Sequence, residues 1–504
     1  MFMRRAVNSS IKFPADRVWL VVLFALMVLL YGAQLGLALH PPALRFELTF
    51  NSMLEHMLAG RFDVDADIVG GEGFLRNGHV YAYWGIWCAL LRLPLWLAQR
   101  MNLDMTGLSC LLAACIAGLA KARTVLLVRK VCAGQGSAVG WIVPLTLGYI
   151  LLGGAGLSFL YPILYQEVSF WAAAFGAVFV YCAIKGLLLG FDQRVLSAMS
   201  ACAGLALLTR VSTGIGLIAA LGLLLLMQCV NAARDAVGNW KMRFASAGRM
   251  LLSARMLAPL AILLLAVAIT GYVNDQRWAS ATTFADYRYY IDNQFYPDRQ
   301  PKVELYGLFN LQRIPMGLVY YFLPLWAFPT SPGHYFMEET HNRLMSPLEM
   351  PPSSFLLTDL FAFCLIGFLV VKLWRGRDEK MPRPSEWLPL AAGLLVPCLL
   401  MLCALSMCYR YRMEFYPEFD LLAFLGLIAL FRDEKLRAFR RHAKAWMAAA
   451  LAVSILSSAV VLVMYKFAPW GNSLPVLKQH HGLVSYYVDT LRAHTPGRFL
   501  RLLK

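Results

Sequence analysis

Charged residues are scarce in this 504-residue sequence. They make up 15% of it, whereas hydrophobic residues make up 59%. A water-soluble domain carries about 25% charged and about 45–50% apolar residues. Many apolar side chains must therefore face a medium other than water, which excludes an ordinary soluble protein and indicates a lipid bilayer.

The motifs of soluble nucleotide and metal enzymes are also missing. The sequence contains no Walker loop, no GxGxxG opening a helix, no HExxH and no CxxC. Its 11 cysteines are an odd number, and most of them lie inside apolar runs. We therefore expect small buried thiols rather than a disulfide framework or a zinc site.

Acidic residues are fewer than basic ones, at 29 against 46, so the formal net charge is +17. In a soluble protein this balance would suggest a nucleic-acid partner. Here the basic residues gather in short segments between apolar runs, at 121–130, 234–255, 372–383 and 432–444. Short basic loops are typical of the cytoplasmic side of a membrane protein. The basic surplus thus predicts topology, and no nucleic-acid partner is expected.

Long apolar runs recur along the whole chain. Because crossing about 30 Å of hydrocarbon takes about 20 helical residues, we predict an all-α polytopic membrane protein with about eleven transmembrane helices. The predicted spans are 18–39, 107–128, 137–157, 168–189, 195–208, 212–230, 256–273, 355–374, 387–408, 416–431 and 446–467. Residues 1–467 would form one transmembrane domain, with a cytoplasmic N-terminus and an uncleaved first anchor. Residues 468–504 are predicted to be a tail on the outer face.

Two long segments are predicted on the outer face. Residues 40–106 form an acidic loop, and residues 274–352 form polar loops. Within the first, the segment 81–99 (YAYWGIWCALLRLPLWLAQ) is rich in Trp and Tyr and is interrupted by Arg92 and Pro94. Such a segment suits the membrane interface better than the hydrocarbon core. We therefore predict an interfacial helix rather than another span.

Candidate catalytic acids lie near the predicted outer ends of the spans. Glu47 occurs in HPPALRFELTF and Glu167 in YPILYQEVSFW, and the two would form a carboxylate pair if their loops meet. Partial burial raises the pKa of a carboxyl group, which lets it act as a general base near neutral pH. Glu55 and Asp63 are secondary candidates, and such acids could equally coordinate a divalent cation. A solvated loop, or for Glu167 a favourable position at a helix N-terminus, is the alternative interpretation.

Three arginines stand out against the charge pattern. Arg210 occurs in LALLTRVSTG at a predicted outer turn, and Arg410 and Arg412 alternate with tyrosines in YRYRMEFYP. A guanidinium group binds phosphate through paired N–H donors, and interfacial tyrosines set the depth of such a site. Snorkelling to the interface is the alternative for Arg210. An interfacial anchor paired with Glu414 and Glu418 is the alternative for Arg410 and Arg412.

This order of features resembles the GT-C superfamily of polytopic glycosyltransferases, which includes protein mannosyltransferases and lipid A aminoarabinose transferases. The resemblance covers a first span followed by an outer loop with an acid (Glu47), the aromatic surface segment YAYWGIWCALLRLPLWL, and an acid at the second outer turn (Glu167). It extends to the hairpin LTRVS and the late motif YRYRMEFYP. The family usually carries Asp, often paired with a second acid, where this chain has Glu47.

The resemblance implies inverting transfer of a sugar from a polyprenyl-phosphate donor at the periplasmic face of a bacterial inner membrane. Glu47 would be the base, and Arg210, Arg410 and Arg412 would hold the donor phosphate. The acceptor would be a lipid, a glycan or a protein. Other interpretations stay open: a transporter or lipid flippase, an enzyme like the O-antigen ligases and polymerases, or a non-catalytic scaffold. A transporter would place polar residues near mid-membrane, often in paired halves, whereas here they gather at one face.

Overall fold

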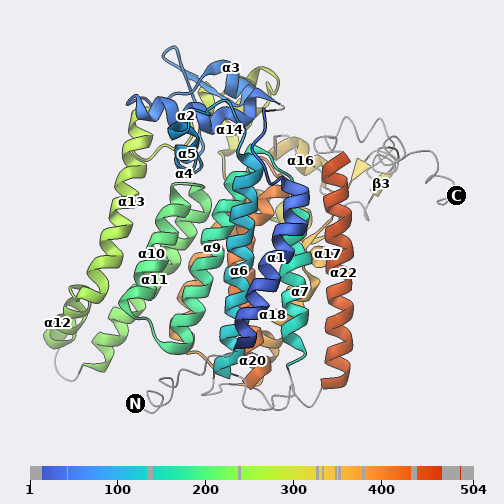
Figure 1. Ribbon diagram of the computed structural model, residues 1–504. Helices are drawn as coiled ribbons and strands as arrows, with labels where there is room; N and C mark the ends of the chain where they lie inside the picture. The colour runs from blue at the N-terminus through green and yellow to red at the C-terminus, as the bar shows by residue number, and fades with distance from the viewer. Residues whose placement is uncertain are drawn as a thin grey trace.

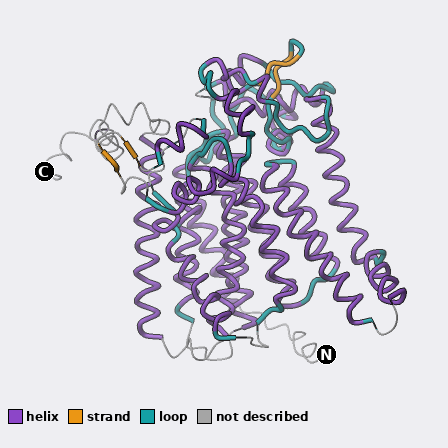
Figure 2. The backbone as a smooth tube through the Cα atoms, turned by 180° about the vertical axis from the view of Figure 1, so that it is seen from behind, coloured by secondary structure: helices purple, strands orange, loops and turns teal. Residues whose placement is uncertain are grey.

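The chain folds into a bundle of upright helices with a cap of short elements at one end (Figure 1). The computed structural model describes residue 489 and residues 14–467, except for 43, 133–139, 237–239, 325–328, 332–333, 336, 347–348, 350–352, 377–380 and 433–439. The tail predicted for residues 468–504 therefore lies outside the described residues, apart from residue 489. Helix dominates the described backbone, and the strands in it form two short hairpins (Figure 2).

Among the described residues, seven helices are long and apolar enough to cross a membrane. They belong to α1 (Pro14–Leu35), α6 (Thr106–Cys132), α9 (Leu164–Leu189), α11 (Val211–Asp235), α13 (Ala254–Trp278), α19 (Pro384–Cys403) and α22 (Arg440–Phe467). An apolar segment in lipid satisfies its backbone polar groups internally only as a helix or a closed barrel, which explains why these runs are helical. The predicted all-α polytopic class is confirmed.

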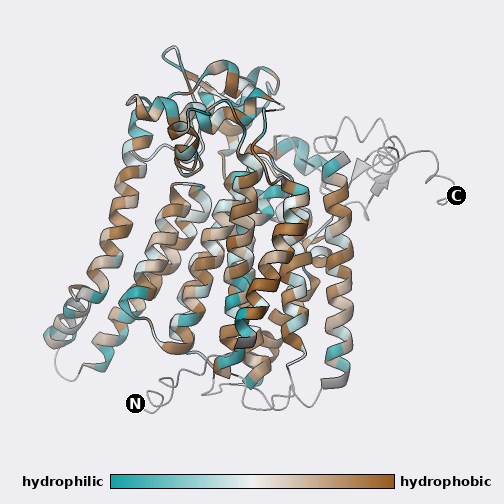
Figure 3. Ribbon diagram, viewed as in Figure 1, coloured by the Kyte–Doolittle hydropathy of each residue, from teal (hydrophilic) through white to brown (hydrophobic). Residues whose placement is uncertain are grey.

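The other four predicted spans are also helical, but their helices are shorter. They are α7 (Ile142–Leu152) with α8 (Gly154–Ser158), α10 (Gln193–Leu207), α17 (Phe355–Thr358) with α18 (Leu360–Trp374), and α20 (Tyr416–Arg432). The number of about eleven crossings stays a prediction. Hydrophobic residues cover the lengths of the helices, and hydrophilic residues are more frequent in the cap (Figure 3). A further amphipathic helix, α12 (Trp240–Leu251), lies at the end opposite the cap (Figure 1).

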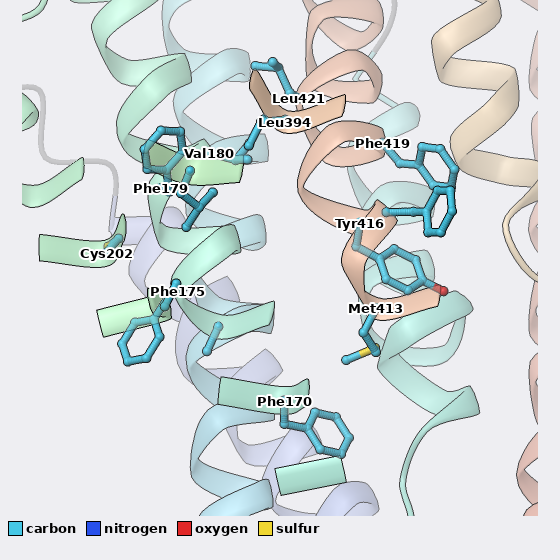
Figure 4. Close-up of a cluster of buried hydrophobic side chains, with 14 of the residues drawn as sticks. Phe170, Phe175, Phe179, Val180, Cys202, Leu394, Met413, Tyr416, Phe419 and Leu421 are labelled. Carbon is cyan, nitrogen blue, oxygen red and sulfur yellow. The ribbon is translucent and has the colours of Figure 1, made fainter. Parts of the chain in front are cut away.

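The bundle is held together by closely packed helix pairs, notably α6 with α9, α11 with α19 and α18 with α20. Aromatic and aliphatic side chains from α9, α10, α19 and α20 fill its interior (Figure 4). Small residues allow the closest approaches, as is usual between helices in membranes. A Cβ atom added to Gly393 of α19 would lie 2.0 Å from the backbone nitrogen of Ala220 in α11.

This contact predicts a stability effect. We expect Gly393→Ala to separate α11 from α19 and to destabilise the protein by about 1–3 kcal/mol, the usual cost of overpacking. Gly222→Ala is the matched control. Gly222 lies on the partner helix α11, and nothing lies within 4 Å of a Cβ atom added there. The thermal midpoint in detergent measures both variants. Equal midpoints would show that α11 and α19 do not pack as described.

The cap combines two segments far apart in sequence. The first contains η1 (Arg45–Leu48), α2 (Thr49–Leu58), α3 (Ala66–Val69), η2 (Gly70–Glu72), the hairpin β1 (Phe74–Arg76) and β2 (His79–Tyr81), α4 (Trp87–Leu90) and α5 (Leu93–Leu97). The second contains η3 (Tyr287–Tyr289), η4 (Ile291–Gln294), α14 (Arg299–Tyr306), η5 (Leu311–Arg313), α15 (Ile314–Phe322), β3 (Pro329–Ser331), β4 (His334–Tyr335) and α16 (Glu338–Leu344). An isolated bridge pairs Phe74 with Tyr290, and the Ile291 N–H donates to the Gly73 carbonyl at 3.0 Å. These contacts hold the two segments side by side.

The segment predicted as an interfacial helix forms two short helices in the cap, α4 and α5. Its apolar part, Trp87–Leu97, is too short to be a candidate span. The Trp87 N–H donates to the Leu208 carbonyl at 2.9 Å, which attaches the segment to the turn between α10 and α11. Arg92 lies between α4 and α5 and is fully buried.

Candidate functional site

Glu167 is bound by an arginine that the sequence analysis did not pair with it. It lies in the first turn of α9, and both its oxygens accept hydrogen bonds from Arg92, one of them at 2.7 Å. Neither side chain has any exposed surface. A carboxylate enclosed in this way is not placed to take a proton from a substrate. Glu167 thus joins α9 to the α4–α5 segment through Arg92, and its pairing with Glu47 stays a prediction.

Arg412 is likewise enclosed. The 3-10 helix η7 (Tyr409–Phe415) follows α19 and directs this side chain into the bundle, where it is 1% exposed. It donates to Asp359 at 3.0 Å and also bonds to Thr358 and Tyr409. Because its charge is neutralised by Asp359, Arg412 is not offered to a ligand in this structure.

Arg210 pairs with Glu414, a residue that the sequence analysis considered as a partner for Arg410 and Arg412. Its guanidinium group bonds to Glu414, which also accepts hydrogen bonds from Ser212 at 2.8 Å and Thr213 at 2.6 Å. The arginine also stacks on Tyr411, with 5.1 Å between its guanidinium carbon and the ring centroid. Arg210 thereby attaches the α10–α11 turn to η7.

Arg410 differs from both. Its guanidinium carbon lies 4.3 Å from the ring centroid of Tyr165 and 5.5 Å from that of Tyr411. In the part of the chain that the structure describes, it has no hydrogen-bond acceptor and no carboxylate within 4 Å. None of its nitrogens is a buried unsatisfied atom, so they keep solvent contact. Arg410 is thus an oriented cation with its N–H donors available.

A carboxylate that the sequence analysis did not single out, Glu72, also interacts with Tyr165. It ends η2, is half-buried, and accepts a hydrogen bond from the Tyr290 hydroxyl at 2.8 Å. It is also close enough to the Tyr165 hydroxyl to interact with it electrostatically. Burial and then the negative charge of Glu72 raise the pKa of Tyr83, whereas the charge of Arg410 lowers it. Glu72 and Arg410 therefore act on the same two tyrosines, Tyr83 and Tyr165, with opposite charges.

We call Glu72, Tyr83, Tyr165, Tyr290 and Arg410 the Glu72–Arg410 site. Trp84 lines it further, with its ring centroid 4.6 Å from that of Tyr83 and 5.8 Å from that of Tyr165. Its members come from separate stretches of the chain, which is why no local motif contains them. The available signal was the sequence GGEG around Glu72. A Cβ atom added to Gly71 would lie 1.9 Å from an Asp292 oxygen, so a larger residue there would displace the Asp292 side chain.

Glu47 lies on the flank of this site. It is half-buried in η1, its carboxylate accepts a bond from the Leu44 N–H at 3.4 Å, and it lies near Tyr161, whose pKa is raised by burial and by Glu47. The neighbouring Phe46 ring packs on Tyr165 at 5.6 Å. Glu47 is therefore attached to the site through Phe46. Glu55 is exposed on α2.

Asp63, the other secondary candidate, is the centre of a separate network in the cap. Its oxygens lie 2.9 Å from Nδ1 of His56 and 3.0 Å from Nδ1 of His79, and Arg61 is 3.5 Å away. Burial raises the pKa of Asp63, but the hydrogen bonds and charges of these partners outweigh it, so the pKa lies below its usual value of 3.8. The network joins α2 to β2.

This network predicts a pH dependence. Because the folded-state pKa of Asp63 is lowered, its stabilising contribution is present above the unfolded-state pKa near 3.8 and is lost as pH falls through the folded-state value. We expect amide exchange in residues 56–79 to rise below about pH 4 and Asp63→Asn to remove that step. Hydrogen exchange from pH 3 to pH 7 measures it, with Glu55→Gln as control. An unchanged step in Asp63→Asn would contradict the assignment.

Metal ligands do not cluster in the described residues. No group of three His, Cys, Asp or Glu side chains there is arranged to hold an ion. Metal dependence stays a question for experiment.

Comparisons with known proteins give structural matches only. No protein-family model and no curated protein sequence matches the chain. The apo oligosaccharyltransferase of Archaeoglobus fulgidus is 14% identical with a TM-score of 0.44, over 97% of this chain and 59% of that one. The same archaeal enzyme, AglB, in complex with an inhibitory peptide and a dolichol-phosphate has a TM-score of 0.43. ArnT from Cupriavidus metallidurans bound to undecaprenyl phosphate is 14% identical with a TM-score of 0.40, over 94% and 76% of the two chains. The chain spans 59% of the length of the archaeal enzyme.

Proposed function

We propose that this membrane protein is a glycosyltransferase that moves a sugar from a polyprenyl-phosphate donor to an acceptor at the cap end of the bundle. The observation that carries the proposal is the geometry of Arg410. Its guanidinium group is held by two tyrosine rings, has free N–H donors, and shares Tyr165 with the carboxylate of Glu72. A site with one available cation and one nearby carboxylate fits an anionic leaving group and a base.

The donor class follows from where this site lies. Tyr165 begins α9 and Arg410 lies in the turn between α19 and α20, so both are at the ends of bundle helices. A phosphate bound there can keep a prenyl chain in the surrounding lipid. Lipid-linked sugars need no nucleotide site, in agreement with the absence of nucleotide motifs from the sequence. The cap end would then be the periplasmic face of a bacterial inner membrane.

In the proposed reaction Arg410 binds the donor phosphate and stabilises the charge that develops on it as it leaves. Glu72 removes a proton from an acceptor hydroxyl or amine, which attacks the anomeric carbon from the opposite side and inverts it. Glu72 replaces Glu47 as the first candidate for the base because it interacts with the tyrosines around Arg410. Glu47 stays the second candidate.

The remaining arginines and Glu167 would position this machinery. Arg210 holds Tyr411, on which Arg410 also stacks. Arg412 anchors η7 through Asp359, and Glu167 anchors the start of α9, where Tyr165 lies. These groups therefore fix the directions of Arg410 and Tyr165 without contacting the substrate.

Two measurements test the proposal. The purified chain in phosphatidylcholine nanodiscs should bind undecaprenyl phosphate, and it should release sugar from one member of a panel of undecaprenyl-phosphate sugars. Lipid and glycan mass spectrometry of a deletion strain should show one glycan missing its terminal sugar, which names the acceptor. No binding of undecaprenyl phosphate together with an unchanged glycan profile would reject the function.

A further inference from the structure

Most buried arginines of the chain are neutralised or fully bonded. Arg92, Arg210 and Arg412 pair with Glu167, Glu414 and Asp359, respectively. Arg313 has no carboxylate partner but donates to the backbone carbonyls of Gly307, Leu308, Leu344 and Cys403. This is expected, because burying a guanidinium charge is costly unless its donors are satisfied.

Arg299 is an exception. It begins α14, is 8% exposed, and stacks against two rings, with its guanidinium carbon 4.6 Å from the Tyr296 centroid and 5.1 Å from that of Tyr290. Only Nε has a partner, the Ser346 hydroxyl at 3.1 Å. Over the described ranges of the chain, no carboxylate oxygen lies within 4 Å of it. Its two terminal nitrogens are not among the buried unsatisfied atoms, so both reach solvent.

The position of Arg299 relative to Glu72 matches that of Arg410. Tyr290 donates its hydroxyl hydrogen to Glu72 and contacts Arg299 with its ring. Tyr165 interacts with Glu72 through its hydroxyl and contacts Arg410 with its ring. Each of the two guanidinium groups is therefore connected to Glu72 through one tyrosine. The two arginines come from different parts of the chain, the cap and the α19–α20 turn.

We propose that Arg299, with Tyr290 and Tyr296, binds an oxyanion on the acceptor, a phosphate or carboxylate near its nucleophilic hydroxyl or amine. The inference rests on the proposed function, in which Arg410 takes the donor phosphate and Glu72 takes the acceptor proton. The acceptor would then reach Glu72 beside Tyr290, where Arg299 presents its two terminal NH2 groups. A guanidinium fork suits an oxyanion with two available oxygens.

The alternative is that Arg299 only offsets the negative charge of the cap. Glu72 and Asp292 both lie in this region; burial and then Glu72 raise the pKa of Asp292, and the charge of Arg299 lowers it. In that case Arg299 would stabilise the cap but would bind no added anion. Measured anion binding separates the two roles.

The experiment measures phosphate binding to the second site while the first is filled. The full chain in phosphatidylcholine nanodiscs is saturated with undecaprenyl phosphate, and labelled inorganic phosphate is titrated by equilibrium dialysis. We expect one further phosphate to bind, and Arg299→Gln to weaken that binding about 10-fold to 100-fold, as for loss of a charged hydrogen-bonding group. Nanodiscs doped with phosphatidic acid compete with phosphate if the acceptor oxyanion belongs to a lipid, and have no effect if it belongs to a soluble molecule.

Arg288→Gln is the matched control, since Arg288 lies in the same cap segment but is 72% exposed and paired with Asp286. It should bind phosphate like the parent chain. If Arg299→Gln does not fold, Tyr296→Leu, which removes one stacking ring, should weaken phosphate binding in a chain with the parent thermal midpoint. Unchanged binding in the folded variant, or no second phosphate on the parent chain, overturns the inference. Failure to bind undecaprenyl phosphate would instead overturn the proposed function.

Discussion

Replacing Arg410 by Gln should reduce sugar release from the polyprenyl-phosphate donor by about 10²-fold to 10³-fold, the usual loss when one charge-stabilising donor is removed. Among the described residues Arg410 has no hydrogen-bond acceptor and no carboxylate within 4 Å, and the charge of Glu349 acts on it only from a greater distance. The charge of Arg410 is therefore available to the phosphate in both the ground state and the transition state. We therefore expect the dissociation constant for undecaprenyl phosphate to rise as well. Turnover and lipid-phosphate binding in nanodiscs measure the two effects.

Arg412, in the same YRYRMEFYP motif, provides the control for this prediction. Arg412, two residues away, is buried on Asp359 and does not face a ligand. Arg412→Lys should lower the thermal midpoint, because it removes bonds to Tyr409, Thr358 and Asp359, but the folded fraction should still bind undecaprenyl phosphate. If Arg412→Lys lost lipid-phosphate binding while Arg410→Gln kept it, the assignment of the two arginines would be reversed.

Replacing Glu72 by Gln should lower the transfer rate by about 10²-fold to 10⁴-fold, the range that a positioned general base supplies. The amide keeps an oxygen that can accept from the Tyr290 hydroxyl, so the fold of the cap should be preserved. Donor binding should be retained because Arg410 is untouched. Turnover and undecaprenyl-phosphate binding, measured in the same nanodiscs, are the specific readout: the first should fall and the second should stay at the parent value.

Glu47→Gln and Glu55→Gln complete that comparison. Glu55 is exposed on α2 and should be without effect. Glu47 lies beside Tyr161, on the flank of the site, and its variant should retain most of the transfer activity. The opposite result, full activity in Glu72→Gln and none in Glu47→Gln, would return the role of base to Glu47, as the family resemblance implied.

Much of the fold could be predicted from the sequence because it depends mainly on the lengths of apolar runs along the chain. A run of apolar residues long enough to cross lipid has to be helical, whatever its neighbours are. The same holds for the segment around Arg92 and Pro94, whose composition indicated that it would not cross. The shorter helices, such as α10 and α18, show where this argument weakens, since helix length alone does not decide whether they cross.

The candidate site could be predicted only in part, because the sequence does not show which charged side chains form ion pairs in the folded protein. The sequence showed that Arg210, Arg410 and Arg412 were unusual, but not that Glu414 and Asp359 neutralise two of them. Glu72 was one acid among several in the loop 40–106. Its importance follows from contacts with Tyr165 and Tyr290, which are distant in sequence.

The sequence by itself determined that this chain is a helical membrane protein, because hydrocarbon admits few alternatives to apolar helices. It also determined where unusual charges occur along the chain. Only the tertiary structure decided which of those charges are available to a ligand. Arg410 and Arg412 each follow a tyrosine, yet η7 turns Arg410 toward Tyr165 of α9 and Arg412 into the bundle. The cost of burying an unpaired charge accounts for the difference, since the buried Arg412 is paired with Asp359.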